Sequence, residues 1–343
     1  MQHQGRAPAT ATHGMTNDAG TTTIATCLHG VPSVLRDGTA LHDAPLDEWD
    51  ETFADLAALG FTAIELADSH LRPADTPPAR GGALRALAAE HGLAIPSLHV
   101  QRASILAPGH EREHLRYAHR SIDAAAEWGM QVFSTGLHRP FTPEQRSALW
   151  FWTAQGPVDS TDQETWAAAV AGFRELGRHA GEVGLRLALE MYEDTLLGTA
   201  ASAVRLIEDI GLDHVGLNPD IGNLIRLKRP VEDWREAYAM TLPHANYWHL
   251  KNYHRDEDPG RGWYSASPAT LEDGLIDYRR VVRDALEGGY DGIFVMEQYG
   301  GDSLGVCATN AAYVRRLLED HDRRADRRRA RTTSITPTEQ ERP

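Results

Sequence analysis

The sequence predicts an α/β protein, built as a single (β/α)8 TIM barrel with a parallel eight-stranded sheet. Eight short apolar runs alternate with eight amphipathic segments over about 300 of the 343 residues, and no larger break separates them. Such alternation favours parallel pairing, because each helix returns the chain to the same edge of the sheet. A doubly wound open sheet is the alternative. The first apolar run is followed by LHGVPSVL, however, which lacks the glycine-rich turn of dinucleotide-binding folds.

The predicted strands are short, apolar and bounded by polar turns. In chain order they cover residues 22–28, 62–66, 94–100, 131–136, 185–191, 215–220, 247–252 and 292–298. Residues two apart on a strand share a face, so Leu185, Leu187 and Leu189 form one apolar face that packs on the helices. Arg186 shares the other face with Glu190 but lies four residues earlier. It should therefore sit at the floor of the barrel, where it needs an acidic partner.

One helix is predicted after each strand. The helices cover residues 47–59, 82–91, 111–128, 163–183, 200–210, 231–241, 277–288 and 304–319. Several end at a glycine, such as Gly60 and Gly129, which suits the left-handed backbone of a helix C-terminal cap. The barrel domain should thus occupy residues 21–320. Residues 1–20 are small, polar and aperiodic, and residues 321–343 are arginine-rich, so we expect both ends to be disordered.

Composition excludes several classes of protein. The 34 basic and 49 acidic residues give a net charge of −15, and without the tail at 321–343, which has seven arginines and four acids, it is −18. So acidic a body repels phosphate backbones and argues against nucleic acid as a partner, although it does not exclude cations. No apolar run approaches the ~18 residues of a membrane span. The two cysteines, Cys27 and Cys307, form no metal or disulfide pattern, which favours a reducing, cytoplasmic setting.

Four side chains are predicted to meet at one mouth of the barrel, because the working residues of this fold stand at the C-terminal ends of strands. The fifth strand ends at Glu190, the sixth at Asp220, the seventh at His249 and the eighth at Glu297. Singly, each has an ordinary alternative role, such as an ion pair, a helix cap or a core histidine. Together, three carboxylates would repel one another unless a cation neutralised them. This donor set without thiolate suits Mn2+ or Mg2+, with Co2+ or Zn2+ less favoured.

Other polar residues near strand ends are candidates for substrate contacts. Lys251 shares a face with His249 and could hold a sugar hydroxyl or pair with an acid such as Glu190. Glu65, His99 and His29 lie near the ends of the second, third and first strands, where they either touch substrate or line the mouth.

A segment of about thirty residues after the fourth strand, residues 138–165, carries His138 and the aromatic cluster Trp150, Phe151 and Trp152. His138 is a candidate general base, or a loop histidine without a role. The aromatic cluster should cap the substrate, cover a flat aglycone, meet a partner subunit or simply pack on the barrel.

Four segments, ALEMYED, GLNPDIGN, YWHLKN and FVMEQYG, resemble the metal-binding segments of the xylose-isomerase-like barrels. This superfamily includes sugar isomerases, ketose 3-epimerases, inosose-processing enzymes and endonuclease-IV-type proteins. The resemblance covers residues 22–318. It implies that Glu190, Asp220, His249 and Glu297 bind one Mn2+ or similar ion, such as Mg2+ or Co2+, and that Glu190 and Glu297 also form the acid/base pair. Many relatives have a histidine where this chain has Asn223.

A narrower resemblance is to the α subunits of bacterial C-deglycosidases, carried by EMYEDT, LNPDIGNLIRLKRP and HLKNYHRDE. It implies a lyase that cleaves the carbon–carbon bond of 3-oxo-C-glycosides together with a small β subunit, with His138 as an additional base. We therefore expect a metal-dependent enzyme that forms the enolate of a keto sugar. The alternatives are an isomerase or epimerase and, more remotely, a metal-binding scaffold without turnover.

Overall fold

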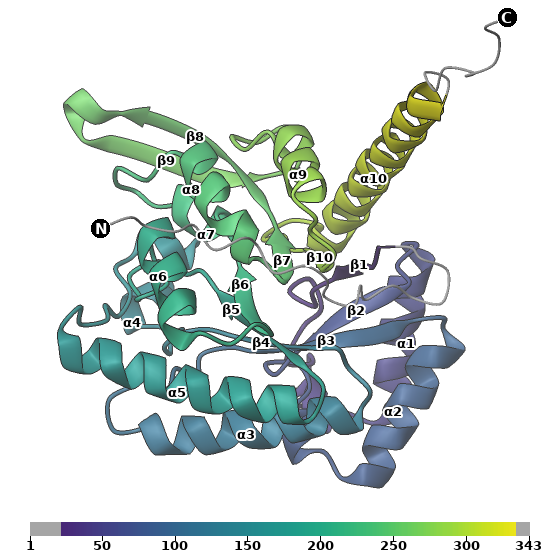
Figure 1. Ribbon diagram of the computed structural model, residues 1–343. Coiled ribbons are helices and arrows are strands. Elements are labelled where there is room, and N and C mark those ends of the chain that lie inside the picture. Colours follow the sequence, from purple (N-terminus) through teal and green to yellow (C-terminus); the bar gives the residue numbers. More distant parts are fainter. Residues whose placement is uncertain (1–21, 334–343) are drawn as a thin grey trace, which may run out of the picture.

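The structure is a computed structural model and describes residues 22–333 (Figure 1). Eight parallel strands form a nearly closed barrel in the order β6-β5-β4-β3-β2-β1-β10-β7, which confirms the predicted fold. Between β6 and β7 the ring is completed by a bridge from Leu217 to Ala245 and a hydrogen bond of 3.1 Å from the amide of Asn246 to the carbonyl of Leu217. The strands are β1 (Ile24–Thr26), β2 (Ala63–Ala67), β3 (Ala94–Val100), β4 (Val132–Thr135), β5 (Arg186–Glu190), β6 (Val215–Asn218), β7 (Tyr247–Leu250) and β10 (Ile293–Met296).

All eight predicted helices are present on the outside of the barrel. They are α1 (Leu46–Ala58), α2 (Pro78–Glu90), α3 (Glu111–Glu127), α5 (Gln163–Glu182), α6 (Ala200–Ile210), α8 (Trp234–Thr241), α9 (Tyr278–Glu287) and α10 (Ser303–Thr333). Short helical segments lie in the connections: η1 (Leu41–Asp43), η2 (Pro73–Asp75), α4 (Pro143–Ser147), η3 (Phe151–Thr153), α7 (Gly222–Ile225), η4 (Leu242–His244) and η5 (Pro259–Arg261).

Two separate apolar clusters follow the alternation of each strand. Leu185, Leu187 and Leu189 belong to the large cluster between strands and helices, as the two-residue period predicts. The interior of the barrel holds a small cluster: Ala25, Cys27, Ala63, Val132, Ala188, Tyr247, Ile293 and Val295. Small residues inside leave room at the C-terminal ends of the strands for longer polar side chains.

The basic residue expected at the barrel floor finds its acidic partner. Nη1 of Arg186 lies 3.1 Å from Oδ1 of Asp291, two residues before β10. The pairing crosses more than a hundred residues of sequence, so only the closure of the barrel brings the two together.

Residues 252–269, which the sequence suggests are a polar loop, form a hairpin instead. Strand β8 (Asn252–Asp258) pairs antiparallel with β9 (Trp263–Ala269), and η5 with Gly262, at φ 65°, makes the turn. The hairpin extends outward from the barrel (Figure 1). Its base is fixed by Asn252, whose Nδ2 donates to the carbonyls of Leu271 and Ile276. Polar side chains on both faces hide the two-residue period that normally predicts a strand.

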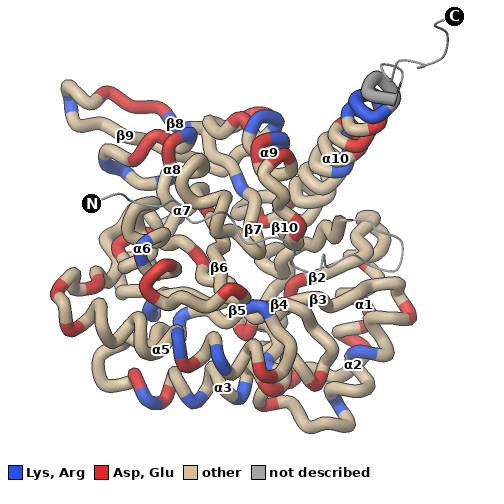
Figure 2. The backbone as a smooth tube through the Cα atoms, viewed as in Figure 1, with Lys and Arg blue, Asp and Glu red and all other residues tan. Residues whose placement is uncertain are grey.

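The prediction that residues 321–343 are disordered is wrong for residues 321–333, which continue helix α10. Ion pairs one turn apart support the extension, from Arg323 to Glu319 and from Arg324 to Asp320, and Arg328 reaches Glu287 of α9. The extension projects from the barrel, and its basic residues are blue in Figure 2. The predicted disorder of residues 1–20 and 334–343 lies outside the described residues.

The structure also bears on membrane insertion. Within residues 22–333, none of the helices combines the length and the apolar character that crossing a bilayer requires.

Candidate metal centre

The four predicted ligands meet at the C-terminal mouth of the barrel. Glu190 ends β5, His249 lies in β7, and Asp220 and Glu297 follow β6 and β10. Each offers one ligand atom, and these four atoms all lie within 4.8 Å of one another. All four side chains are buried. Strands far apart in sequence therefore supply one compact set of three carboxylates and one imidazole.

Three polar atoms of this set have no hydrogen-bond partner among residues 22–333: Oδ1 of Asp220, Nδ1 of His249 and Oε2 of Glu297. Nδ1 of His249 lies 3.1 Å from Oε2 of Glu297 and 3.7 Å from Oε1 of Glu190. Each unpaired buried polar atom costs about 1–3 kcal/mol, and charged ones cost more. A divalent cation bound to the set would satisfy all three at once, so the residues present fit such an ion. Oxygen-rich donors with one imidazole suit a hard or borderline ion.

Lys251 supplies one positive charge beside the cluster. Its Nζ lies 2.5 Å from Oδ2 of Asp220 and 2.6 Å from Oε1 of Glu297. The sequence left an ion pair open as its role, but the partners are these two residues and not Glu190. With three carboxylates and one ammonium, the cluster keeps two negative charges, which one divalent cation would balance. Gly222 allows this approach, because a Cβ there would lie 2.5 Å from Cγ of Lys251.

Burial and mutual repulsion shift the pKa values of the carboxyl groups. Burial, together with the charges of Glu297 and Glu190, raises the pKa of Asp220 to about 8 against the opposing effect of Lys251. Burial acts in the same direction on Glu297, but the Lys251 ammonium and the His249 ring hold the pKa of Glu297 well below its ordinary value. One carboxyl group of the three thus tends to keep a proton unless a cation takes its place.

The second nitrogen of His249 is held from behind by Glu65 of β2. Nε2 of His249 lies 2.8 Å from Oε2 of Glu65, which also accepts a hydrogen bond of 2.6 Å from the Tyr247 hydroxyl. Tyr247 in turn lies 2.7 Å from Oγ of Ser97. A carboxylate behind a ligating imidazole fixes the tautomer that leaves Nδ1 free for a metal. Glu65 is buried behind His249, where its carboxylate can position the imidazole.

Replacing Glu65 by glutamine should weaken metal binding about 10- to 100-fold, the usual effect of losing such a partner. The amide retains the shape of the side chain but not the charge that orients the His249 ring. Calorimetric titration of the metal-free protein with Mn2+ measures the change in the dissociation constant. Glu51→Gln on the exposed face of α1 is the matched control. An unchanged dissociation constant for Glu65→Gln would contradict this role.

Glu190 is the most heavily contacted of the ligands. Its Oε2 lies 3.0 Å from Nε2 of His99 and 3.1 Å from Nε2 of His138. Its Oε1 accepts a hydrogen bond of 2.9 Å from Nδ2 of Asn223, which also lies 3.0 Å from Oδ2 of Asp220. Although burial opposes it, these imidazoles hold the pKa of Glu190 well below its ordinary value. Asn223 thus joins two of the four side chains.

His138 follows β4 and is buried beside Glu190. Burial lowers the pKa of His138 to about 4, although the nearby carboxylate opposes this shift, so the ring is neutral near pH 7. Because the Glu190 carboxylate only accepts, Nε2 of His138 carries the proton. Nδ1 then has a free lone pair and no hydrogen-bond partner within the part of the chain that the structure describes. Gly136 makes room for the ring, since a Cβ there would lie 2.7 Å from Cε1 of His138.

Aromatic residues of the segment 138–165 roof the centre. Phe151 and Trp152 contact Tyr299, which comes two residues after Glu297, at ring-centroid distances of 5.8 and 5.6 Å. The guanidinium of Arg226 lies against both rings, 4.8 Å from the ring centroid of Phe151 and 5.1 Å from that of Trp152. Both carboxylate oxygens of Glu193 accept from Nη2 of Arg226 at 2.9 Å. This roof was not predicted as a unit, because it joins loops after four different strands, β4, β5, β6 and β10.

Two loop residues at this mouth, Arg102 and Asp194, have left-handed backbones, with φ of 56° and 62°. Such conformations cost about 1–3 kcal/mol in a residue other than glycine and persist where surrounding contacts impose them. Arg102 donates to the Tyr192 hydroxyl at 3.0 Å, and Asp194 pairs with Arg229 at 2.7 Å. Both strained residues therefore sit in the framework that supports the roof.

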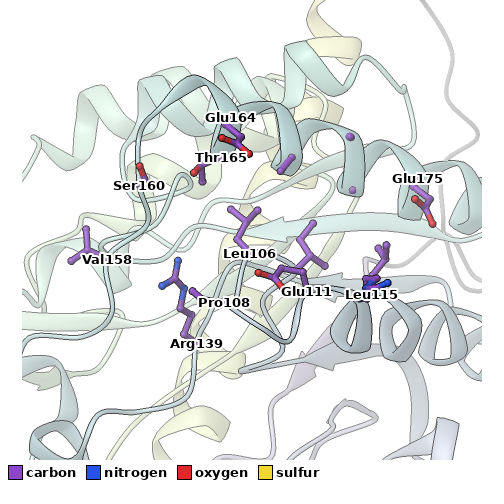
Figure 3. A pocket seen from close by; sticks show the side chains of 15 residues that line it. Leu106, Pro108, Glu111, Leu115, Arg139, Val158, Ser160, Glu164, Thr165 and Glu175 are labelled. Atoms are coloured by element: carbon purple, nitrogen blue, oxygen red, sulfur yellow. The ribbon is translucent and has the colours of Figure 1, made fainter.

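A cavity of about 690 Å³ lies outside the barrel, between α3, α5 and the segment 138–165 (Figure 3). Leu106, Arg139, Val158 and Glu175 are among the residues that line it, and none of the four ligands does. Arg139, which lines this cavity, forms an ion pair with Asp159. The cavity is thus separate from the centre, whose ligands are enclosed beneath the aromatic roof.

The remaining predicted residues divide into two groups. His99 and Lys251 contact the ligands directly, as described above. His29 stays apart, because its Nδ1 lies 2.9 Å from Sγ of Cys27 and its ring packs against Tyr299. Tyr247 and Ser97 were missed, although the two-residue period places them on the faces of His249 and His99.

Comparison with known proteins agrees with this architecture. Residues 53–319 match the family model described as xylose isomerase-like TIM barrel. A crystal structure of a xylose isomerase-like TIM barrel protein from Mycobacterium smegmatis, in complex with magnesium, superposes with a TM-score of 0.84 at 43% identity. It covers 88% of this chain and 98% of that chain.

Two enzymes are more distant relatives. An inosose dehydratase from Lacticaseibacillus casei is 26% identical over 143 residues, which are 40% of this chain and 48% of that enzyme. The chain thus matches about half the length of this relative. A D-psicose 3-epimerase from Agrobacterium fabrum is 23% identical over 231 residues, 63% of this chain and 72% of that enzyme. The family model matches more than three quarters of the residues of this chain. The chain therefore belongs to the xylose isomerase-like TIM barrel family.

Proposed function

We propose that this protein is a divalent-metal-dependent lyase that removes the proton beside the carbonyl of a keto sugar and expels a leaving group from the next carbon. The observation that carries the proposal is the buried set of Glu190, Asp220, His249 and Glu297, with three unpaired atoms directed at one another. Acid and base side chains adjoin this set directly. That combination suits proton abstraction next to a carbonyl.

The four ligands would hold the ion, and Mn2+ is our first choice. Magnesium in the related Mycobacterium smegmatis structure makes Mg2+ the main alternative, and Co2+ also suits these donors. A bound divalent cation supplies positive charge that stabilises the developing enolate oxygen, an effect worth several kcal/mol.

Proton transfer falls to the chain's own carboxylates and to His138. We assign the removal of the substrate proton to Glu297, one of the four side chains that would hold the ion. Oε1 of Glu190 lies 3.7 Å from Nδ1 of His249, the same nitrogen that Glu297 approaches. Nδ1 of the neutral His138 ring has a free lone pair and can take up a proton from the substrate, while Glu190 stabilises the resulting charged ring through its contact with Nε2. In a lyase Nδ1 then returns that proton to the leaving group, and the ring is neutral again.

The roof supports a flat organic leaving group. Phe151, Trp152 and Tyr299 present aromatic surface above the centre, and stacking on such rings favours an aromatic aglycone. Our first choice is therefore cleavage of the carbon–carbon bond of a 3-oxo-C-glycoside. The relation to an inosose dehydratase supports elimination in general, because a dehydratase also expels a group, water, from its substrate.

A small β subunit forms part of this proposal. Leu149 and Val158, both in the segment 138–165, are 87% and 59% exposed, and Val158 lines the outer cavity. A subunit bound at this segment would cover them and could hold the roof open for the substrate.

Epimerisation of a ketose is the second candidate function. It is favoured by the related D-psicose 3-epimerase and by the two carboxylates, Glu190 and Glu297, which both lie near Nδ1 of His249. In that reaction one carboxylate removes the proton and the other returns one to the opposite face. His138 would then have no part in the chemistry.

Product analysis separates the two functions. With Mn2+ and the candidate β subunit, a 3-oxo-C-glucoside should release free aglycone, and His138→Gln should slow that release about 10²- to 10⁴-fold. His91→Gln is the control, because His91 also contacts a carboxylate, Asp50, but lies on the outer surface. The epimerase would be favoured over the lyase if the protein interconverts a free ketose and releases no aglycone. In that case the His138→Gln variant should also be fully active.

A further inference from the structure

Helices α3 and α5 lie next to each other on the outside of the barrel (Figure 1), and a pair of histidines joins them. Nδ1 of His119 on α3 lies 2.7 Å from Nδ1 of His179 on α5. The two ring centroids are 4.9 Å apart, and the ring planes differ by 34°. This pair is remote from the candidate metal centre, because it lies on the outer layer of helices.

The outer nitrogen of each ring faces a carboxylate. Nε2 of His119 lies 2.9 Å from Oε1 of Glu175, and Nε2 of His179 lies 2.8 Å from Oδ1 of Asp123. An ionised carboxylate only accepts hydrogen bonds, so both Nε2 atoms must carry a proton. A neutral imidazole has a single N–H. Both Nδ1 atoms of the neutral rings therefore present lone pairs to each other.

Two lone pairs at 2.7 Å attract only if a positive centre lies between them. That centre is either one extra proton shared by the rings or a metal ion bound by both. The carboxylates behind the rings match the arrangement found behind metal-bound histidines, where the second ring nitrogen donates to a carboxylate and fixes the tautomer. The geometry thus presents two preoriented nitrogen ligands rather than a chance contact.

We propose that His119 and His179 form a second, peripheral site for a borderline transition-metal ion of the Zn2+ class, which clamps α3 to α5. Imidazole pairs prefer Zn2+, Co2+, Ni2+ or Cu2+ over Mg2+ and Mn2+, so the selectivity differs from that of the oxygen-rich centre in the barrel. Tetrahedral bonds of about 2.0–2.1 Å separate two nitrogen ligands by about 3.3 Å, which a small opening of the pair provides. The side chains are 28% and 20% exposed, so water can complete the coordination.

Zinc stoichiometry tests the site. The metal-free protein, His119→Gln and His179→Gln are dialysed against Zn2+, and the bound metal is measured by elemental analysis. His91→Gln is the matched control, because Nε2 of His91 has the same kind of contact, 2.6 Å from Asp50, but no facing imidazole. The wild type and His91→Gln should bind one equivalent more than either of the other variants. The difference is independent of whether the barrel centre also binds Zn2+, so failure of the two sites can be told apart.

A second measurement uses the unaltered chain. Diethyl pyrocarbonate modifies accessible imidazoles, and peptide mapping should show that Zn2+ protects His119 and His179 but leaves His91 reactive. Two results would overturn the metal site and leave a shared proton between the rings. One is the same zinc content in the wild type and in all three variants. The other is that diethyl pyrocarbonate modifies His119 and His179 equally with and without Zn2+.

Discussion

Replacing Glu190 by glutamine is expected to lower kcat/KM about 10³-fold or more, with the fold retained. The change removes one negative charge from the four predicted metal ligands, and the same carboxylate belongs to the acid/base pair. General acid–base groups alone contribute about 10²- to 10⁴-fold to the reaction rate. The amide also fits its neighbours poorly. Oε2 of Glu190 faces Nε2 of both His99 and His138, and an NH2 group there would meet two nitrogen atoms, at least one of which carries a proton.

Steady-state kinetics on the keto-sugar substrate, together with circular dichroism, measures this effect. Glu182→Gln is the matched control, because Glu182 is an exposed glutamate at the end of α5, the helix that precedes Glu190. It should behave as wild type in both measurements. A Glu190→Gln enzyme with wild-type kcat/KM would refute the assigned centre. If Glu190→Gln does not fold, the same kinetics are measured on Asp220→Asn.

Removing the metal with a chelator should abolish turnover, and adding Mn2+ should restore it. Without the cation, Lys251 and nearby histidines such as His249, His99 and His138 are the groups that offset the charges of Glu190, Asp220 and Glu297, and the unpaired ligand atoms lose their partner. The free energy of unfolding should also fall. A ligand present at 1,000 times its dissociation constant contributes about 4 kcal/mol to stability, and that contribution disappears with it.

Activity and melting temperature are measured in the same samples before chelation, after chelation and after addition of Mn2+, Mg2+ or Co2+. Asp220→Asn provides the control, because it should show little activity and little metal-dependent change in melting temperature. A scaffold without turnover behaves differently: its melting temperature depends on metal, but there is no keto-sugar activity to lose or restore. Activity that survives complete metal removal would exclude the proposed mechanism.

The alternating pattern of the sequence determined most of the barrel. Eight apolar runs with helices between them predict parallel strands, and the two-residue period separates the leucines at 185, 187 and 189 from the face of Glu190. The ligand set follows from the same rule, because residues at the C-terminal ends of parallel strands stand at one mouth. These features depend on local spacing, which a sequence records directly.

Such local patterns do not predict the features that join distant segments of the chain. The polar hairpin at 252–269 has no alternation, and the end of α10 depends on ion pairs in a stretch whose composition favours disorder. The ion pair between Arg186 and Asp291 spans the barrel floor, and its acidic member could not be named beforehand. Each of these depends on a partner that local spacing does not identify.

At the centre, the sequence determined which residues gather, but only the tertiary structure decided their roles. Glu65 lies behind His249, Lys251 bridges Asp220 and Glu297, and Asn223 joins Glu190 to Asp220. These roles depend on distances of about 3 Å between side chains from different strands. Strand order and spacing bring such residues to one level of the barrel, whereas closure of the ring and burial determine which atoms face each other and which remain unpaired for a cation.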